Sequence, residues 1–357
     1  MMNLRTRSLP VLLLALVACG GAAPEPASPE NASAKEAKAA PATTEPAKPA
    51  EPAKPTPAET PELKPSPPTV HVVSNGTAPR KQLRYVFKAG ANELLEMNLK
   101  MSLGMGMGGD RMGREIKMPT ARMVMKIEIA EVLPDGNAKL GAKAERIELL
   151  RDVPLDEGPR TQLEQSLASL VGMKAHATVS TRGVTSDMEF ELPPNADEKA
   201  KANLESMRDT LRELYVPLPE EEVGANAKWD VDARMPISGA MVDVKRTYSV
   251  KELKADAVKT DITVAMSAPA KQPMRSIPLP PGMTALLDSL KGEGTGKATT
   301  PFARLVGESN MQVTLDMAID AGNETDRQKL VMHNVTEVTI KPSKAAPANN
   351  AAKPKTK

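Results

Sequence analysis

The chain has 357 residues, a formal net charge of +2 at pH 7, one cysteine and three histidines. The near-neutral charge excludes a global positive field that would attract nucleic acid, and a single cysteine excludes a disulfide within the chain. The length allows one large folded core or two coupled halves.

The amino-terminal residues 1–18 have the three parts of a secretory signal peptide. Arg5 and Arg7 supply positive charge, an apolar core runs from Leu9 to Val17, and small residues follow it. The core is too short for a transmembrane helix, which needs about 20 apolar residues. We therefore expect residues 1–18 to direct export and to be removed.

The apolar core ends in Leu16, Ala18 and Cys19, and Gly20 follows. This spacing resembles the bacterial lipobox, which implies cleavage before Cys19 and attachment of lipid, including palmitate, to that residue. An ordinary signal peptide cut near Ala18 is the alternative, but a lone exported cysteine favours lipidation. Gly20 replaces the Asp of an inner-membrane retention signal. The resemblance therefore implies that the protein is anchored on the periplasmic side of the outer membrane. The inner membrane and the cell surface are the less favoured alternatives.

Two segments of low complexity follow the signal and end the chain. Residues 19–70 are rich in Ala, Pro, Glu and Lys and predict a disordered linker, because proline removes backbone donors and alanine buries little surface. Val70 to Asn75 fits either an edge strand or more linker. The basic residues 343–357 predict a disordered tail suited to anionic envelope polymers, and Lys357 resembles the residue that links some lipoproteins to peptidoglycan.

The region between these segments, residues 71–342, is expected to fold into a β-rich domain. Apolar and polar residues alternate in five stretches, over 95–103, 123–129, 262–266, 311–319 and, more loosely, 335–340. This is the period of half-buried strands, which are typical of antiparallel sheets. Asp135–Asn137 and Ala321–Asn323 carry turn residues and predict hairpins.

Three helices are expected. Asn195 caps the longest, over 195–216, which Pro217 ends. A shorter helix is predicted from Pro159 to Gly172, and a third, of about two turns, from Thr284 to Leu290.

Short matches between the two parts of the domain indicate a duplication. Gly90–Asn92 is matched by Gly224–Asn226, Met125–Lys126 by Val244–Lys245, and Arg182–Gly183 by Val306–Gly307. These matches predict halves over 81–192 and 218–342, each a strand–strand–helix–strand unit. The fold class we expect is mainly β (α+β), with antiparallel curved sheets that form a partly closed barrel or a sandwich.

The 21 methionines outnumber the three Phe, three Tyr and one Trp. Methionine packs irregular space and suits apolar surfaces that adapt to varied ligands. Ordinary core packing is one interpretation. A second is an apolar cavity lined by Met97, Met101, Met125 and Met266. A third is a copper site in the loop Gly104–Met112, but Met105 and Met107 continue the preceding strand, and we expect no metal site.

Motifs for catalysis are missing from the sequence. His71, His176 and His333 are far apart and lack metal-binding spacing, and no nucleophile elbow, phosphate loop or dinucleotide fingerprint occurs. We therefore expect no catalytic residue, no cofactor and no enzymatic activity. A hydrolase with two dispersed carboxylates is the remaining alternative.

Two further stretches carry a family resemblance, Tyr85–Gly90 and Leu218–Trp229. Together with the lipobox and the proline-rich linker, they resemble an uncharacterised family of bacterial lipoproteins that contain a domain of unknown function. The resemblance covers most of 81–342 and implies no known activity. Within the second stretch, we expect Trp229 to be a large core residue at the junction of the halves rather than a residue that stacks on a ligand.

These features predict an anchored, non-enzymatic envelope lipoprotein. Its partners are expected to be the membrane, through the amino-terminal lipid, and either a lipid-like ligand or an envelope partner, a protein or peptidoglycan. A structural or interaction module without a small-molecule ligand is the alternative.

Overall fold

The computed structural model describes residues 66–107, 115–193, 214–237, 239–274, 279, 282–323 and 325–343. The predictions for the signal peptide, for Cys19 with its flanking residues, for residues 19–65 of the linker, for residues 195–213 of the helix expected over 195–216 and for the tail after residue 343 lie outside these ranges. The described ends of two predictions are wrong, because residues 66–70 of the expected linker form a strand and residues 214–216 of the expected helix are not helical.

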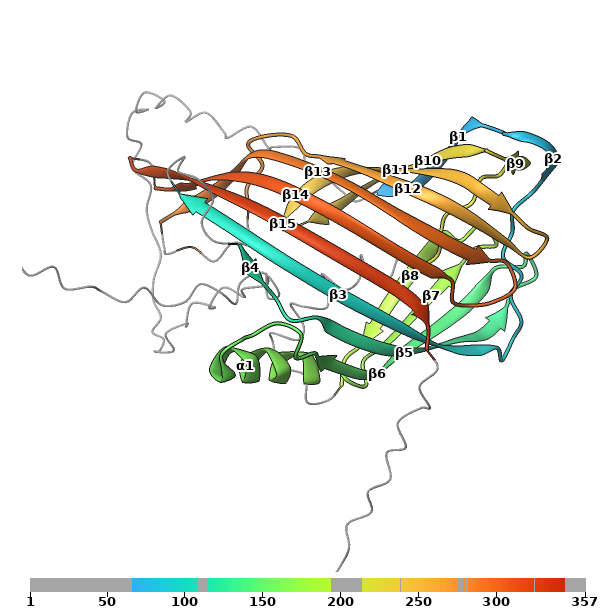
Figure 1. Ribbon diagram of the computed structural model, residues 1–357, viewed down its shortest axis with the longest axis horizontal. Helices are drawn as coiled ribbons and strands as arrows, with labels where there is room; N and C mark the ends of the chain where they lie inside the picture. The colour runs from blue at the N-terminus through green and yellow to red at the C-terminus, as the bar shows by residue number, and fades with distance from the viewer. Residues whose placement is uncertain are drawn as a thin grey trace, which may run out of the picture. The chain divides into compact units, whose positions relative to one another are not determined.

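Strands make up most of the described chain (Figure 1). In the first part these are β1 (Ser66–Ser74), β2 (Thr77–Lys81), β3 (Asn92–Met107), β4 (Ile116–Lys117), β5 (Ala121–Val132), β6 (Ala138–Leu149), β7 (Lys174–Val179) and β8 (Thr185–Glu191). The second part contains β9 (Val223–Ala225), β10 (Lys228–Ile237), β11 (Ala240–Leu253), β12 (Ala257–Ser267), β13 (Thr284–Pro301), β14 (Glu308–Gly322) and β15 (Arg327–Pro342). The described helix, α1, spans Glu157–Ala168.

One antiparallel sheet contains 13 of these strands, in the order β1-β10-β11-β12-β13-β14-β15-β3-β5-β6-β7-β8, with β4 beside β3. β2 and β9 form a separate pair. The sheet is curved and open, because β1 and β8 end it without pairing with each other among the described residues (Figure 1). The prediction of a mainly β, antiparallel fold with few helices is confirmed, and 13 strands form one continuous sheet instead of a two-sheet sandwich.

The strands predicted from alternation lie where expected, in β3, β5, β12, β14 and β15, and the two predicted hairpins connect β5 to β6 and β14 to β15. The undecided segment Val70–Asn75 belongs mostly to the edge strand β1, which pairs with β10. β1 also contains His71.

Two meanders follow one another along the chain, β3-β5-β6-β7-β8 and β10-β11-β12-β13-β14. The matched residue pairs occupy equivalent places in them: before the first strand, in the second strand, and in the turn after the fourth strand. β15 lies between β14 and β3 and joins the meanders into one sheet. The duplication itself stays a prediction.

One helix prediction is confirmed and another is wrong. α1 corresponds to the helix expected over 159–172, but Thr284–Leu290 is the start of β13 and pairs with β14. A register shift between Leu287 and Ser289 places Ala285, Leu287 and Leu290 on the buried side. The extra residue turns a spacing of two into one of three, which resembles a helical period in the sequence. No helix in the described ranges is long and apolar enough to cross a membrane.

The register identifies the inner face of the sheet, because directly opposed residues in an antiparallel ladder share a face. One such row crosses seven strands, through Val231, Arg246, Val264, Gly294, Val313, Thr336 and Met101. Along β11 every second residue from Ala240 to Val250 is buried. The main hydrophobic core lies on this inner face.

Candidate functional site

An aromatic cluster of three rings belongs to the hydrophobic core. Tyr85 and Phe87 precede β3, and their rings pack against Tyr215, with centroids 5.2 Å and 6.1 Å from that ring. The Tyr85 hydroxyl donates to the carbonyl of Val216 at 3.2 Å and accepts from its backbone N–H at 3.1 Å. Burial raises the pKa of Tyr85 well above its usual range. The cluster therefore ties the entry of the first meander to the segment that leads into the second.

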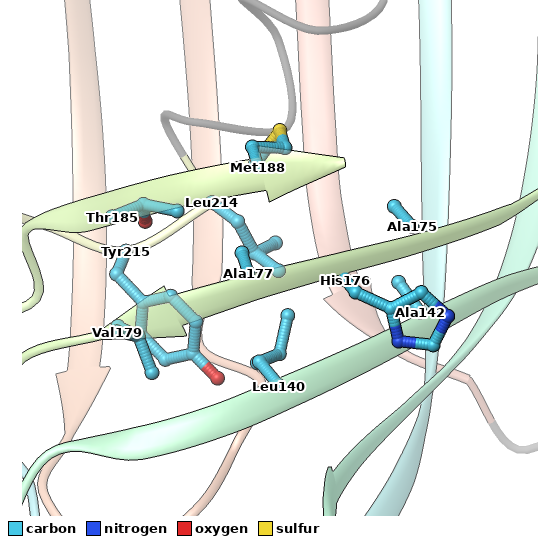
Figure 2. A pocket seen from close by; sticks show the side chains of 10 residues that line it. All are labelled: Leu140, Ala142, Ala175, His176, Ala177, Val179, Thr185, Met188, Leu214 and Tyr215. Atoms are coloured by element: carbon cyan, nitrogen blue, oxygen red, sulfur yellow. The ribbon is translucent and has the colours of Figure 1, made fainter. Parts of the chain in front are cut away.

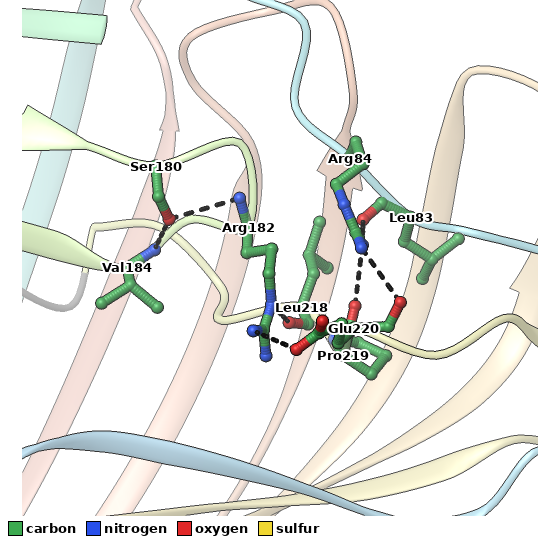
Figure 3. Close-up of polar contacts among 8 residues, drawn as sticks. All are labelled: Leu83, Arg84, Ser180, Arg182, Val184, Leu218, Pro219 and Glu220. Carbon is green, nitrogen blue, oxygen red and sulfur yellow. Dashed lines mark hydrogen bonds and ion pairs between the residues drawn. The ribbon is translucent and has the colours of Figure 1, made fainter. Parts of the chain in front are cut away.

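Two arginines fix that same segment from outside the cluster (Figure 3). Arg84 donates to the carbonyls of Leu83, Pro219 and Glu220 at 2.7–2.9 Å. Arg182 donates to the carbonyl of Leu218 at 3.0 Å and to the carboxylate of Glu220 at 3.3 Å. Burial, followed by the nearby charge of Arg182, lowers the pKa of Arg84. These contacts satisfy backbone carbonyls that regular strand pairing leaves unused.

Trp229 in β10 has no exposed surface. Its indole N–H donates to the carbonyl of Pro217 at 3.0 Å, and its ring stacks on Tyr248 with centroids 5.5 Å apart. Trp229 is therefore a core residue that contacts Pro217, in the segment between the two meanders. A ligand would meet Tyr248 before it met Trp229, because Tyr248 lines the cavity described next.

The inner face encloses a cavity of about 720 Å³, within the range of pockets that hold small molecules. Its walls come from β1, β3, β8, β10 to β15 and the segment 214–217, so both meanders contribute. The cavity is half-enclosed and its lining is mainly apolar, with large side chains from Met101, Leu214, Met235, Ile237, Ile262, Met266, Leu305, Met311, Val313, Leu315, Val338 and Ile340.

Four charged residues interrupt this apolar lining, Arg234, Arg246, Arg304 and Glu308, and Arg246 lies at the centre of a buried strand. Arg246 is 8% exposed, and it lies on the inner face of β11 in register with Val231 on β10 and Val264 on β12. Arg246 has an interaction with another group of the chain. A charged side chain is rarely placed among apolar strand residues without a partner, because desolvation disfavours the ion.

A small pocket adjoins the cavity between β6, β7 and β8 (Figure 2). Its volume is about 10 Å³, no more than one water needs. Thr185, Leu214 and Tyr215 line both spaces. The buried hydroxyls of Thr185 and Tyr215 have no hydrogen-bond partner among the residues that the structure describes. Buried polar atoms normally have a partner, so this wall offers two positions for a polar atom of a ligand.

The four methionines expected to line a cavity all lie on the inner face, where the register relates Met97 to Met123, Met101 to Thr336, Met125 to Leu95 and Met266 to Gly292. Only Met101 and Met266 line the cavity. Met125 is 1% exposed within the core, and Met97 packs against the core. Met105 and Met107 belong to β3, and Met112 lies outside the described residues.

No histidine lines the cavity, although His176 lines the small pocket beside it (Figure 2). His71, His176 and His333 lie in β1, β7 and β15, beside Asp232, Glu191 and Asp316 respectively. Within the described ranges, no three His, Cys, Asp or Glu side chains gather into a group that could hold a metal ion.

Sequence reasoning missed Arg246, although a signal for it exists. Val242, Val244, Tyr248 and Val250 occupy alternating positions, and Arg246 stands at the centre of this apolar series. A charged residue in the buried register of a strand is the informative exception to the pattern.

The described residues thus define one class of protein, an open and curved antiparallel sheet with an apolar cavity on its inner face. No family model and no curated protein matches the chain. Among solved structures, the chain is similar to a loop L8 deletion mutant of OmpT, an outer membrane protein of Vibrio cholerae. The two sequences are 8% identical, the match covers 70% of this chain and 100% of that chain, and the TM-score is 0.17. OccK8 (OprE) of Pseudomonas aeruginosa aligns with 7% identity, 70% and 98% coverage, and a TM-score of 0.14.

Proposed function

We propose that this protein is an envelope lipoprotein that binds an apolar, lipid-like ligand in the cavity on the inner face of its sheet. The observation that carries the proposal is the cavity of about 720 Å³ with mainly apolar walls. Apolar surface that stays open to water after folding costs free energy, and a ligand that covers it recovers that energy. The protein acts by holding its ligand and carries out no chemistry on it.

The location follows from the amino-terminal sequence. Lipidation of Cys19 anchors the chain to the periplasmic side of the outer membrane, and the linker over 19–65, which precedes β1, separates the sheet from the membrane surface. Several acyl chains on one residue hold a membrane far more firmly than a single chain does. Replacement of Cys19 by Ser tests this part, because the variant is expected to leave the membrane fraction of the cells. Retention of Cys19→Ser with the membranes would contradict it.

The cavity is tested with a neutral apolar dye, N-phenylnaphthylamine, whose fluorescence rises in an apolar site. The full chain carrying Cys19→Ser is expected to bind it saturably. Val313→Trp places a bulky side chain on the cavity wall and is expected to weaken binding by roughly tenfold or more, since it displaces ligand volume. Gln312→Trp is the matched control, because Gln312 is the exposed neighbour on the same strand.

The outcome separates a ligand carrier from a packed interaction module. Saturable binding that Val313→Trp weakens and Gln312→Trp leaves intact supports the proposal. Equal dye binding in all three chains, or none in the parent, would contradict it and favour a module that acts through its outer surface.

A further inference from the structure

The apolar wall of the cavity contains four methionines: Met101, Met235, Met266 and Met311. Each is half-buried in its strand. A methionine side chain is unbranched and has three rotatable bonds, so it fits surfaces of different shape. The valines and isoleucines of the same wall are branched next to the backbone and are restricted at χ1. The methionines are therefore the parts of the apolar wall that change shape most easily.

Two of these methionines lie opposite glycines in β13. Met266 on β12 is in register with Gly292, and Met311 on β14 is in register with Gly296. A methyl group on Gly292 would lie 3.1 Å from the sulfur of Met266, and one on Gly296 would lie 3.2 Å from Cβ of Met311. Directly opposed residues of a sheet normally restrict each other through their side chains. Because glycine has no side chain, nothing at these two positions of β13 holds either methionine in one rotamer.

The charged residues of the lining have partners in the chain or lie exposed; they are Arg234, Arg246, Arg304 and Glu308. Arg234 donates to the carboxylate of Asp243 at 2.6 Å and 3.0 Å, and Arg304 donates to that of Glu93 at 3.3 Å and 3.4 Å. Arg246 has an interaction with another group of the chain, and the acidic residue of the four is exposed at the start of β14. The fit of an uncharged aliphatic chain therefore depends mainly on the apolar side chains of the wall.

We propose, building on the apolar-ligand function above, that the cavity accepts aliphatic chains of different shapes, straight, bent or branched, with similar affinity. Met266 and Met311 give the cavity this breadth, because their side chains change rotamer to follow the shape of the ligand. The ligand class is therefore lipids with mixed acyl chains rather than a lipid of one fixed shape.

The test measures displacement of the neutral dye from the full Cys19→Ser chain by three uncharged alcohols: hexadecanol, palmitoleyl alcohol and phytanol. Their main chains have the same length, and they are straight, bent by a cis double bond, and branched, respectively. In the parent chain we expect the three displacing concentrations to agree within roughly threefold.

The variant that carries both Met266→Ile and Met311→Ile keeps apolar side chains on the wall but makes them stiff at χ1. It is expected to lose about tenfold in affinity for the bent and branched alcohols relative to hexadecanol, the size of effect that a poorly fitting methylene group has in an apolar pocket. Met97→Ile is the matched control, because Met97 lies on the same inner face but outside the cavity lining. It should leave the relative affinities unchanged.

Each outcome decides a separate point. Strong discrimination among the three alcohols by the parent chain would overturn the breadth of the cavity, and unchanged relative affinities in the double variant would overturn the role of the two methionines. Should the double variant fail to bind the dye, Met266→Ile and Met311→Ile are measured separately, and each is expected to show part of the shift. Absence of dye binding in the parent chain would instead reject the proposed function itself.

Discussion

At the scale of single residues, the face of the sheet on which a side chain lies determines its role. On β11, Lys245 points outward and pairs with Asp230, whereas the adjacent Arg246 points inward and lines the cavity. The two cations differ in position by one residue, which in a strand reverses the side. Lys245 therefore remains half exposed and Arg246 is buried.

Substitution of Trp229 tests how the core packs beside the segment between the two meanders. Trp229→Ala removes a fully buried ring, its stacking on Tyr248 and its hydrogen bond to Pro217. We expect a loss of about 3–5 kcal/mol in the free energy of unfolding, measured by urea denaturation. Trp229→Phe keeps a ring against Tyr248 and should lose less. Unchanged stability of Trp229→Ala would show that the residue does not support the junction.

Asp230 gives a pH-dependent prediction. Burial raises its pKa, but the hydrogen bonds from Lys245 and Thr247, both at 2.6 Å, outweigh burial and hold the pKa below its ordinary value of 3.8. A lowered pKa in the folded state adds stability above the unfolded pKa of about 3.9, and this stability is lost as the pH falls below it.

Asp230→Asn is therefore expected to cost about 1–2 kcal/mol at neutral pH, less than for a fully buried pair because Lys245 is 53% exposed. The difference between variant and parent should shrink as the pH falls below the unfolded pKa of about 3.9 and through the lowered pKa of the folded state, because the carboxylate of the parent is then protonated in both states. Urea denaturation from neutral to acidic pH measures it. A difference that does not change with pH would argue against the ionised pair.

At the scale of elements, β13 explains how the sheet curves. Its inner positions Gly292, Gly294 and Gly296 carry no side chain, while Lys291 and Lys297 on its outer face are exposed. A methyl group on Gly294 would lie 2.8 Å from the carbonyl oxygen of Gln312 and 2.8 Å from Val313, and 3.3 Å from Val264. The flanking strands thus close over the glycines, which permit local bending of a sheet.

Gly294→Ala should therefore separate β13 from β14 locally and lower the free energy of unfolding by about 1–3 kcal/mol. Thr295→Ala, one residue away on the exposed face, serves as the control and should cost less than about 1 kcal/mol. Thermal and urea denaturation of both variants measure the effect. Equal stability of Gly294→Ala and the parent would contradict the role of the glycines in curvature.

The elements also mark the limit of prediction from sequence. Alternation located β3, β5, β12 and β14, because one face of each is buried and the other is in water. The bulge at the start of β13 led to the wrong prediction of a helix, because it spaces the buried residues as a helix would. The register shift that produces the bulge arises from pairing with β14. Local spacing holds no information on such long-range pairing.

At the scale of the whole sheet, the cavity results from the order of the strands. β15, last in the chain, lies between β14 and β3, so the wall of the cavity joins Met101 from the start of the domain to Thr336 near its end. The sequence predicted that Met97, Met101, Met125 and Met266 line a cavity, but its pattern did not separate cavity positions from core positions. That distinction depends on strand order and curvature. In the folded sheet, Met101 and Met266 line the cavity and Met125 lies in the core.

Native mass spectrometry of the full chain, released from its own membranes, shows whether the cavity holds a ligand. We expect a population that carries a noncovalent adduct of lipid mass, and we expect Val313→Trp to lose the adduct while Gln312→Trp retains it. Detection of the parent chain without any adduct would contradict a ligand in the cavity. An adduct that Val313→Trp retains in full would contradict it as well.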